Sequence, residues 1–343
     1  MINWFTEARR NASRTGPLIA PKGDEAMKRV VVTDHAFRDV TIEEAAAVEN
    51  GATFACFACV EERETADAVA GADVAIVNFA PITRAVLERM NTGATVIRYG
   101  IGYDNVDLEA ARQLGIQVAN VPDYGVDTVA DHAVASLLTM ARRIPLYNQR
   151  IQANGWTRPG DVGPIPGFRS MIVGLVGMGR IAQAVHKRLA PFGFSFVGFD
   201  PFCPAEVFAE LGIEQVGLQE LAACSHAITL HAPSTPETHR MIGDDFFAHA
   251  QEGIVLVNTA RGPLVDLDAL ASAVKDGKVA GAVLDVTDPE PLPADSPLRL
   301  MPEVVLTPHA AFYDEDSLRN LQQLASDEAV RAVRGEELRC RVV

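Results

Sequence analysis

Short runs of β-branched and other apolar residues alternate along most of the chain with segments of helical periodicity. Such alternation predicts the α/β class, with parallel sheets that carry helices on both faces. A Gly/Pro-rich loop at 155–167 separates two such series, so we expect two Rossmann-like, doubly wound parallel-sheet domains. The expected strands of the first series are Arg29–Thr33, Thr53–Val60, Val74–Asn78, Thr95–Arg98 and Ile116–Asn120. Those of the second are Ile172–Val176, Ser195–Phe199, Ala227–Leu230, Ile254–Asn258, Ala280–Leu284 and Val304–Thr307.

The segments between these strands have the spacing of amphipathic helices, and the longest runs from about Val126 to Gln152. Residues 1–26 lack both an apolar period and the apolar segment of a secretory signal. We therefore expect a disordered extension there, with Met27 as an alternative start of the native chain. Further helices are expected at Ile42–Glu49, Leu108–Leu114, Arg180–Leu189 and Glu315–Val333.

The length of 343 residues fits two domains, and 48% apolar with 22% charged residues is typical of a soluble globular protein. No apolar run is long enough to cross a membrane. The formal net charge of −15 disfavours nucleic-acid binding, which would need a local basic patch that the sequence does not contain. The five cysteines are scattered and odd in number, which predicts a reduced, cytoplasmic protein.

The pair Cys56-Phe-Ala-Cys59 has the spacing of a redox or zinc motif. It lies in an expected strand, where an offset of three residues places the thiols on opposite faces. No second pair completes a zinc site, so we interpret both cysteines as packing residues and expect no metal. The same lack of a ligand cluster disfavours zinc-dependent alcohol dehydrogenase chemistry.

The segment Gly177-Met178-Gly179-Arg180-Ile181-Ala182 matches the dinucleotide-binding pattern G-x-G-x-x-G/A. It follows an expected strand and opens an expected helix, which is the context that the pattern requires. Gly177 permits the tight turn and Gly179 lets a diphosphate approach the backbone. The amides of Arg180 and Ile181 would point at that diphosphate from the helix N-terminus.

An acidic residue, Asp200, ends the next expected strand, 23 residues after Gly177. An acid at this place binds the two ribose hydroxyls of the cofactor and repels a 2′-phosphate. The following Pro-Phe-Cys-Pro offers no arginine to receive such a phosphate. The sequence therefore predicts NAD(H) rather than NADP(H).

A cation, a carboxylate and an imidazole, Arg261, Glu290 and His309, follow three later strands. Open α/β sheets bind ligands at this carboxyl edge. Hydride transfer to a ketone needs a proton donor such as histidine, a carboxylate that favours its protonated form, and a guanidinium that clamps the substrate carboxylate. Simpler interpretations remain for each residue: a solvated His309, surface charge at Glu290, or a structural ion pair of Arg261 with Asp266 or Asp268.

Together these segments resemble the D-isomer-specific 2-hydroxyacid dehydrogenase family, from Met27 to about Val333. Arg98–Gly102 and His309–Ser317 are most similar to the C-terminal-binding-protein-like branch, which contains dehydrogenase-like corepressors as well as enzymes. The resemblance rests on Arg98-Tyr-Gly-Ile-Gly-Tyr-Asp-Asn-Val-Asp107, the Gly177 turn, His231-Ala-Pro-Ser-Thr-Pro-Glu-Thr238, Asn258-Thr-Ala-Arg261-Gly, Asp285-Val with Glu290-Pro, and Thr307-Pro-His309.

The resemblance implies a role for each of these positions. His309 would be the general acid/base, Glu290 its carboxylate partner and Arg261 the cation that orients the substrate. Asp285 would hold the nicotinamide carboxamide. Other residues implied to contact the cofactor are Ile101, Met178, Thr259, Ala260 and, near the adenosine half, Ala232, Pro233 and Thr238. The amides of Gly100 and Gly102 would face the substrate carboxylate.

The resemblance also implies a discontinuous substrate domain, 27–125 plus 312–343, and an NAD-binding domain at 126–311. The active site would then lie in the cleft between them. Region 126–167 matches the dimerisation arm of the family, so a homodimer is expected.

The first domain supplies one expected cation, Arg98, for the substrate carboxylate or a more distal anion. Phosphoglycerate dehydrogenases carry basic residues in the loop that corresponds to Val77–Thr83, and this loop has none. The chain also ends at Val343, with no room for a C-terminal regulatory domain. We therefore expect an unphosphorylated substrate. Four aromatic residues form an apolar wall for the substrate side chain or, alternatively, pack the core between the domains: Phe79, Tyr99, Phe312 and Tyr313.

The sequence thus predicts an NAD-dependent D-2-hydroxyacid dehydrogenase that reduces a small 2-oxo acid. Two alternatives stay open. One is an NAD(H)-sensing, corepressor-like binding protein with weak dehydrogenase activity, and the other is a phosphoglycerate dehydrogenase-like enzyme.

Overall fold

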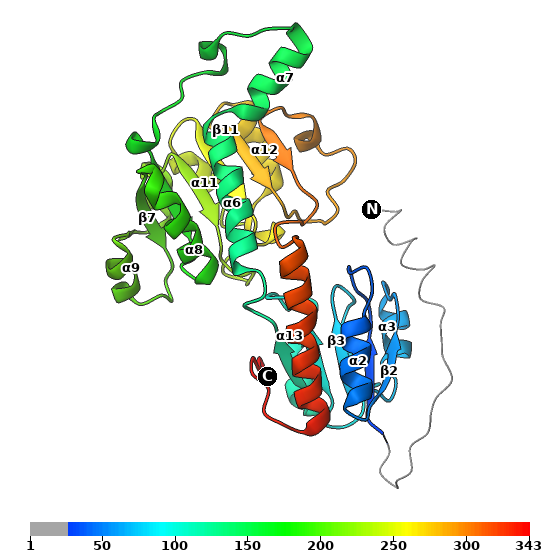
Figure 1. Ribbon diagram of the computed structural model, residues 1–343. Helices are drawn as coiled ribbons and strands as arrows, with labels where there is room; N and C mark the ends of the chain where they lie inside the picture. Colours follow the sequence, from blue (N-terminus) through cyan, green and yellow to red (C-terminus); the bar gives the residue numbers. More distant parts are fainter. Residues whose placement is uncertain (1–26) are drawn as a thin grey trace. The chain divides into compact units, whose positions relative to one another are not determined.

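The computed structural model describes residues 27–343 in two compact units (Figure 1). Unit 1 contains the described residues up to Gly125 together with Asp314–Val343, and unit 2 contains Val126–Tyr313. The second boundary therefore falls two residues later than the expected 311/312. The predictions for residues 1–26 lie outside the described residues.

Unit 1 is built on a parallel sheet with the strand order β2-β1-β3-β4-β5. Side chains alternate across its strands, so that Val31 packs under α3–α5 while Val30 and Val32 pack under α2 and α13. The strands are β1 (Arg29–Val32), β2 (Thr53–Cys56), β3 (Val74–Val77), β4 (Thr95–Arg98) and β5 (Gln117–Asn120). The helices are α2 (Thr41–Glu49), α3 (Glu62–Ala68), α4 (Arg84–Leu87), α5 (Leu108–Leu114) and α13 (Glu315–Arg334).

The C-terminal segment of unit 1 pairs with the outer edge of β5. Arg341 forms an antiparallel bridge with Ala119, and the amide of Val342 donates to the carbonyl of Val118 at 2.7 Å. Arg339 fixes the start of this segment through a two-armed ion pair with Asp123, at 2.8 and 2.9 Å. The tail therefore occupies hydrogen-bonding positions that an edge strand otherwise exposes.

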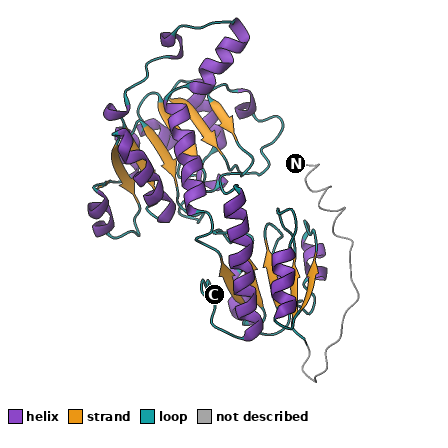
Figure 2. Ribbon diagram, viewed as in Figure 1, coloured by secondary structure: helices purple, strands orange, loops and turns teal. Residues whose placement is uncertain are grey.

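Unit 2 contains a seven-stranded parallel sheet of order β12-β11-β10-β9-β6-β7-β8, with helices on both faces (Figure 2). The strands are β6 (Ile172–Val176), β7 (Ser195–Phe199), β8 (Glu214–Gln215), β9 (Ala227–Leu230), β10 (Ile254–Asn258), β11 (Val279–Leu284) and β12 (Val304–Leu306). The α-helices are α6 (Val126–Ala141), α7 (Ile144–Asn154), α8 (Arg180–Leu189), α9 (Ala205–Leu211), α10 (Leu218–Cys224), α11 (Asp244–His249) and α12 (Leu267–Lys275). Short 3-10 turns lie at Pro159–Val162, Phe168–Ser170, Ala190–Phe192, Gly262–Leu264 and Pro297–Leu300.

The direction of winding of the second sheet reverses at β6. The chain passes from β6 outward to β7 and β8, and then returns to place β9 on the other side of β6. Ligands of open α/β sheets bind at such a switch point, beyond the carboxyl ends of the strands. The residues that follow β6 and β9 are therefore placed where a dinucleotide binds.

The structure confirms the predicted fold class and corrects several element boundaries. The long helix expected at 126–152 is two helices, because Arg143 adopts a left-handed conformation (φ 54°) and Pro145 opens α7. The strand expected at Thr53–Val60 ends at Cys56. The short strand β8 was not predicted, because its two residues are exposed and carry no apolar pattern.

Both cysteines of the Cys56-Phe-Ala-Cys59 segment are packing residues. Burial raises the pKa of each thiol to about 12, so neither forms a thiolate near neutral pH. Across residues 27–343, no group of three or more His, Cys, Asp or Glu side chains is arranged to hold a metal ion.

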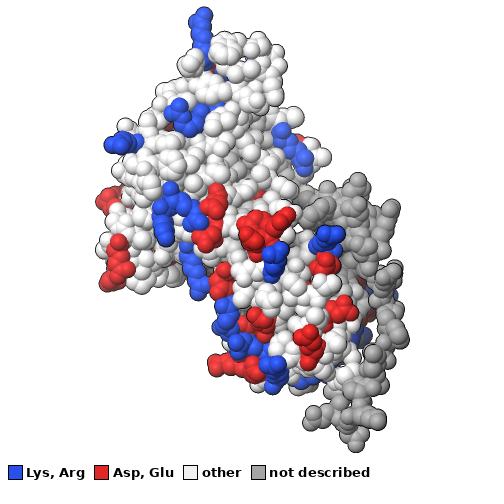
Figure 3. Space-filling model, in the orientation of Figure 1, with Lys and Arg blue, Asp and Glu red and all other residues white. Residues whose placement is uncertain are grey.

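Two surface features bear on the expected partners. None of the described helices combines the length and the apolar character that crossing a bilayer requires. On the face drawn in Figure 3, basic and acidic side chains are interspersed instead of gathered by sign. That face has no continuous positive surface of the kind that binds nucleic acid.

Candidate active site

The turn after β6 admits only glycine at its first position. Gly177 has φ +87°, and a Cβ there would lie 2.8 Å from the carbonyl carbon of His231 and 2.9 Å from the amide nitrogen of Ala232. A Cβ on Gly179, by contrast, would meet nothing within 4 Å. Helix α8 begins at the next residue, with Ala182 fully buried against the sheet. The turn thus combines close backbone packing on one side with open space at the helix N-terminus, as a diphosphate cradle requires.

Asp200, directly after β7, is joined to this turn. Its Oδ2 accepts a hydrogen bond from the amide of Met178 at 2.9 Å. Its Oδ1 accepts from the amides of Phe202 and Cys203, at 2.9 and 3.1 Å. The carboxylate therefore lies at the glycine turn, on the side of β7, and its ribose-binding role stays a prediction.

The segment after β9 forms the opposite side of the cradle. Ala232 is buried beside Gly177. The hydroxyl of Thr238 closes a local turn, because it accepts from the amide of Thr235 at 2.8 Å and donates to the carbonyl of Pro233 at 2.8 Å. Burial lowers the pKa of the neighbouring His231 to about 3, so this imidazole is neutral and serves packing.

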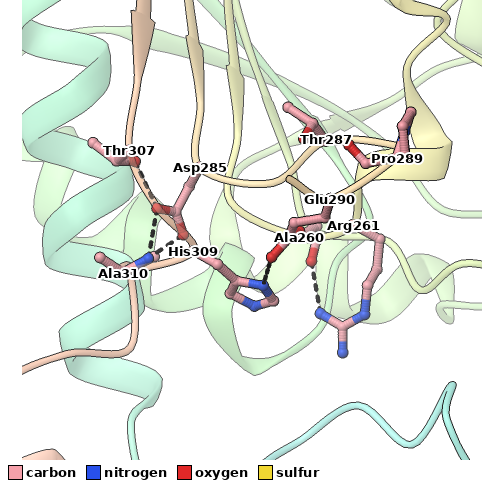
Figure 4. Close-up of polar contacts among 10 residues, drawn as sticks. Ala260, Arg261, Asp285, Thr287, Pro289, Glu290, Thr307, His309 and Ala310 are labelled. Atoms are coloured by element: carbon pink, nitrogen blue, oxygen red, sulfur yellow. Dashed lines mark hydrogen bonds and ion pairs between the residues drawn. The ribbon is translucent and has the colours of Figure 1, made fainter. Parts of the chain in front are cut away.

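The imidazole of His309 and the carboxylate of Glu290 form a direct pair. Nδ1 of His309 lies 2.8 Å from Oε1 of Glu290, and the two side chains are 28% and 38% exposed (Figure 4). With Nδ1 bound to the carboxylate, a proton transfer to a substrate would have to use the other ring nitrogen, Nε2. His309 also has a left-handed backbone, with φ 53°, a conformation that a non-glycine residue keeps only when its surroundings impose it.

Asp285 imposes that conformation. Its side chain is 2% exposed and accepts hydrogen bonds from the hydroxyl of Thr307 at 2.5 Å and from the amides of Ala310 and Ala311 at 2.8 and 2.9 Å (Figure 4). The amide of His309 donates to the backbone carbonyl of Asp285 at 2.8 Å. Asp285 thus anchors the loop on both sides of His309, and its contact with a nicotinamide carboxamide stays a prediction.

Arg261 lies on the loop after β10, and that loop packs on the one that carries Glu290. A Cβ on Gly262 would collide with the carbonyl of Thr287 and lie 2.7 Å from the amide nitrogen of Asp288. Only glycine therefore lets the two loops meet. Figure 4 shows the guanidinium of Arg261 beside the His309–Glu290 pair, beyond the ends of the strands.

The contacts of Arg261 and Asp266 bear on the simpler interpretation of this arginine as one half of a structural ion pair. Nη1 of Arg261 donates to the carbonyl of Ala260 at 2.6 Å. Asp266 caps α12 by accepting from the amides of Asp268 and Ala269, and its Oδ2 lies 3.4 Å from Arg240. The carboxylate of Asp266 is thus engaged by groups other than Arg261.

The residues expected to bind substrate from unit 1 lie at the carboxyl ends of β3 and β4. The guanidinium of Arg98 donates to the carbonyl of Tyr99 and stacks over the ring of Phe79, 5.8 Å from its centroid. A Cβ on Gly100 would collide with this guanidinium, so the glycine gives Arg98 its position. The carbonyl of Ile101 accepts from Asn120 at 2.7 Å, and Gly102, the next residue, is half-buried.

The structure corrects the interpretation of Tyr99 as part of an apolar substrate wall. Tyr99 is 1% exposed, packs in the core of unit 1, and donates its hydroxyl to Glu43 at 2.7 Å. Of the other aromatic residues, Phe79 and Tyr313 are 49% and 55% exposed. Phe312 packs edge-on to His309, with ring centroids 6.3 Å apart.

Several polar residues that shape the site were not assigned a role from the sequence. Asn258 holds the Arg261 loop by donating to the carbonyl of Arg261 at 2.8 Å and accepting from the amide of Ala260 at 3.0 Å. Asp34 accepts from the amides of Asn78 and Phe79 at 3.0 and 2.6 Å. Asn258 is the last residue of β10, and Asp34 comes directly after the strand expected at Arg29–Thr33. A polar residue at the carboxyl end of an apolar strand is the signal that could have identified both.

A doubly wound sheet with a glycine turn at its switch point defines a dinucleotide-binding protein. The family model for the NAD-binding domain of D-isomer specific 2-hydroxyacid dehydrogenases matches residues 134–311. The chain is 36% identical over 258 residues to a glyoxylate reductase of Korarchaeum cryptofilum, covering 75% of this chain and 78% of that protein. The chain therefore belongs to the D-isomer specific 2-hydroxyacid dehydrogenase family and carries its NAD-binding domain, as predicted.

The names of two further relatives indicate different substrates. A D-3-phosphoglycerate dehydrogenase of Methanocaldococcus jannaschii is 34% identical over 316 residues, which are 90% of this chain and 58% of that protein. The present chain thus spans little more than half the length of that relative. The structure of a D-lactate dehydrogenase from Aquifex aeolicus, complexed with NAD and lactic acid, superimposes with a TM-score of 0.80. It is 26% identical, and the match covers 90% of this chain and 96% of that one.

Proposed function

We propose that the protein is an NAD-dependent D-2-hydroxyacid dehydrogenase that acts as a 2-oxoacid reductase. The observation that carries the proposal is the His309–Glu290 pair, at 2.8 Å, next to Arg261 at the carboxyl edge of the sheet that holds the glycine turn. Acid/base histidine, carboxylate partner and guanidinium are the groups that reduction of a 2-oxo acid needs.

Each of the three groups has one chemical task. Arg261 binds the substrate carboxylate and polarises the adjacent ketone. Protonated His309 donates the proton on Nε2 to the ketone oxygen while C2 accepts a hydride, so that C=O becomes CH–OH. Glu290 stabilises the imidazolium through Nδ1 and fixes the ring orientation. A bound nicotinamide supplies the hydride. In the reverse direction, neutral His309 accepts the hydroxyl proton.

The residues of the cradle fit NAD. The open space above Gly179 accommodates a diphosphate, and the amides of Arg180 and Ile181 start the helix beside it. Asp200 would bind the ribose hydroxyls and disfavour a 2′-phosphate. The hydroxyl of Thr259 is buried and meets no hydrogen-bond partner in residues 27–343, which suits a residue that borders the cofactor. We assign the remaining cofactor contacts to Ile101, Gly177, Met178, Ala232, Pro233, Thr238, Ala260, Arg261, Asp285 and His309.

We further propose that the substrate is a small, unphosphorylated 2-oxo acid. Arg98 would bind its carboxylate together with the amides of Gly100 and Gly102, and Phe79 and Phe312 would contact its side chain. The loop Val77–Thr83 contains no basic residue, and a dianionic phosphate in a protein of net charge −15 would need more than one cation. The phosphoglycerate dehydrogenase among the relatives keeps the phosphorylated alternative open.

A panel of 2-oxo acids followed by NADH absorbance tests this proposal. We expect at least one of glyoxylate, hydroxypyruvate, phenylpyruvate and a thioether 2-oxo acid to be reduced, with NADH preferred to NADPH. D-3-Phosphoglycerate with NAD should give no turnover. Turnover of phosphoglycerate alone would support the phosphorylated alternative. No turnover of any acid, with NADH still bound, would support an NADH-responsive binding protein of the C-terminal-binding-protein type.

We also propose that the protein is a homodimer formed through α7 and the loop after it. Within the described part of the chain, 27–343, no residue of α7 is buried, and Ile151 and Trp156 are 39% and 78% exposed. Light scattering should give twice the 36.8 kDa of one chain, and the double variant Ile151→Asp/Trp156→Asp should give one chain mass. A monomeric wild-type protein would contradict this proposal. The cytoplasmic location stays a prediction.

A further inference from the structure

The backbone of Tyr99 belongs to the loop 98–102, which we assign to the substrate carboxylate, but its side chain points away from that loop. Arg98 and Gly100 stand on one side of the chain at the end of β4, and Tyr99 enters the core beneath α2 and α13 on the other. Its hydroxyl donates to Oε1 of Glu43, at 2.7 Å, and Nε2 of Gln322 donates to both oxygens of Glu43, at 3.2 and 3.1 Å. We call Glu43, Tyr99 and Gln322 the Tyr99 anchor.

Burial of the Glu43 carboxyl group in the Tyr99 anchor costs desolvation free energy. Glu43 is 1% exposed, and burial raises its pKa because the charged form loses water. Apolar residues of similar size would pack there without that cost. The hydrogen bond instead fixes the orientation of the Tyr99 side chain, because a phenol bound to a fixed carboxylate occupies a single position.

The position of Tyr99 determines that of the loop. The amide of Tyr99 donates to the carbonyl of Val77 at 2.8 Å, and its carbonyl accepts the guanidinium of Arg98. The next residue, Gly100, accepts from the amide of Val121 at 3.0 Å. The ring of Phe37 packs edge-on against the Tyr99 ring, with centroids 4.9 Å apart. A displaced Tyr99 therefore displaces both Arg98 and the Gly100 peptide.

We propose that Glu43 and Gln322 are positioning residues that act through Tyr99 to hold Arg98 and the Gly100–Gly102 amides in the geometry that binds the 2-oxo acid carboxylate. This inference rests on the proposed function. It assigns substrate affinity to two buried residues, Glu43 and Tyr99, and to the half-buried Gln322, whose side chains would touch no substrate.

Removal of the phenol hydroxyl tests the Tyr99 anchor. In Tyr99→Phe we expect KM for the 2-oxo acid to rise about tenfold, with kcat and KM for NADH within about twofold of wild type. Thr65→Val is the matched control, because Thr65 also loses one buried hydroxyl hydrogen bond, to the carbonyl of Glu61 at 2.9 Å, but lies on α3, under the other face of the sheet of unit 1. The control should leave all three constants unchanged.

Two further variants separate positioning from stability. Glu43→Gln keeps an oxygen acceptor for Tyr99 and should retain most of the substrate affinity. Gln322→Met leaves the hydrogen bond between Tyr99 and Glu43 in place, so it should raise KM for the 2-oxo acid about threefold, less than Tyr99→Phe does. A purely structural anchor predicts another pattern: a lower melting temperature with KM for the 2-oxo acid within about twofold, or equal rises in KM for acid and NADH. Either result would overturn the inference.

Hydrogen exchange of the peptide that spans residues 98–105 supplies a readout that does not need turnover. Tyr99→Phe should accelerate exchange in this peptide and leave the strands of unit 2 unchanged. If wild-type protein reduces no 2-oxo acid, the proposed function fails, and this measurement decides alone whether the anchor positions the loop. Unchanged exchange at residues 98–105 would contradict the positioning role of the Tyr99 anchor, whatever the enzyme activity.

Discussion

Replacement of His309 by glutamine is expected to lower kcat for 2-oxo acid reduction by about 10²- to 10⁴-fold, with little change in the affinity for NADH. Glutamine keeps a polar side chain of similar reach but cannot donate a proton as an imidazolium does. Steady-state kinetics and a fluorescence titration with NADH measure the two effects. His249→Gln is a matched control, because His249 lies on α11 and its polar contacts within residues 27–343 are with Asp245 of the same helix, at 2.7 Å to the carbonyl and 3.8 Å to the carboxylate.

The direction of the reaction adds a second test of the same residue. Reduction needs protonated His309 and oxidation needs neutral His309, so the optimum for reduction should lie at lower pH than the optimum for oxidation. Glu290→Gln should weaken reduction more than oxidation, because it removes the charge that stabilises the imidazolium. Undiminished turnover in His309→Gln, or coincident pH optima for the two directions, would contradict the assignment.

Replacement of Arg261 by glutamine is expected to lower kcat/KM for the 2-oxo acid by about 10²- to 10³-fold. The planar guanidinium can bind a carboxylate with two parallel hydrogen bonds and polarise the ketone beside it. Arg261→Lys keeps the charge without the two-pronged geometry and should recover only part of the loss. The measurement is kcat/KM for each acid of the panel, together with NADH affinity.

The control for Arg261 is Arg240→Gln. The side chain of Arg240 is exposed and lies 3.4 Å from Asp266, the residue that caps α12, so its loss should leave kcat/KM unchanged. An Arg261→Lys enzyme as active as wild type would show that charge alone is required. A Gln variant that loses NADH affinity in step with kcat/KM would instead assign Arg261 to the cofactor.

Strands in the centre of a sheet were predictable because their apolar runs end sharply. The expected bounds of β6, β7, β9 and β10 agree with the structure, and each run is closed by a glycine or by a polar or acidic residue. The edge strand β8 has two exposed residues, and no hydrophobic pattern marks it. The break between α6 and α7 falls at the left-handed Arg143, and Pro145, two residues later, is the signal in the sequence that could have predicted it.

In the candidate site, the residues with short motifs were predictable from the sequence, whereas the residues that hold them in place were not. Gly177, Asp200, Glu290 and His309 belong to short motifs with fixed chemistry, and the structure brings the last two within 2.8 Å of each other. The groups that hold them depend on contacts between distant segments. The phenol of Tyr99 meets Glu43, which is 56 residues away, and no local pattern says which face of a strand end is the core.

The tail that lies along β5 has a consequence for how the protein behaves at high concentration. An open edge strand is a template on which a neighbouring chain can add a strand of its own, and growth by such addition leads to fibrils. The bridge between Ala119 and Arg341 fills that template with the chain's own backbone. Residues 341–343 thus act as a built-in guard against self-association through this side of the sheet.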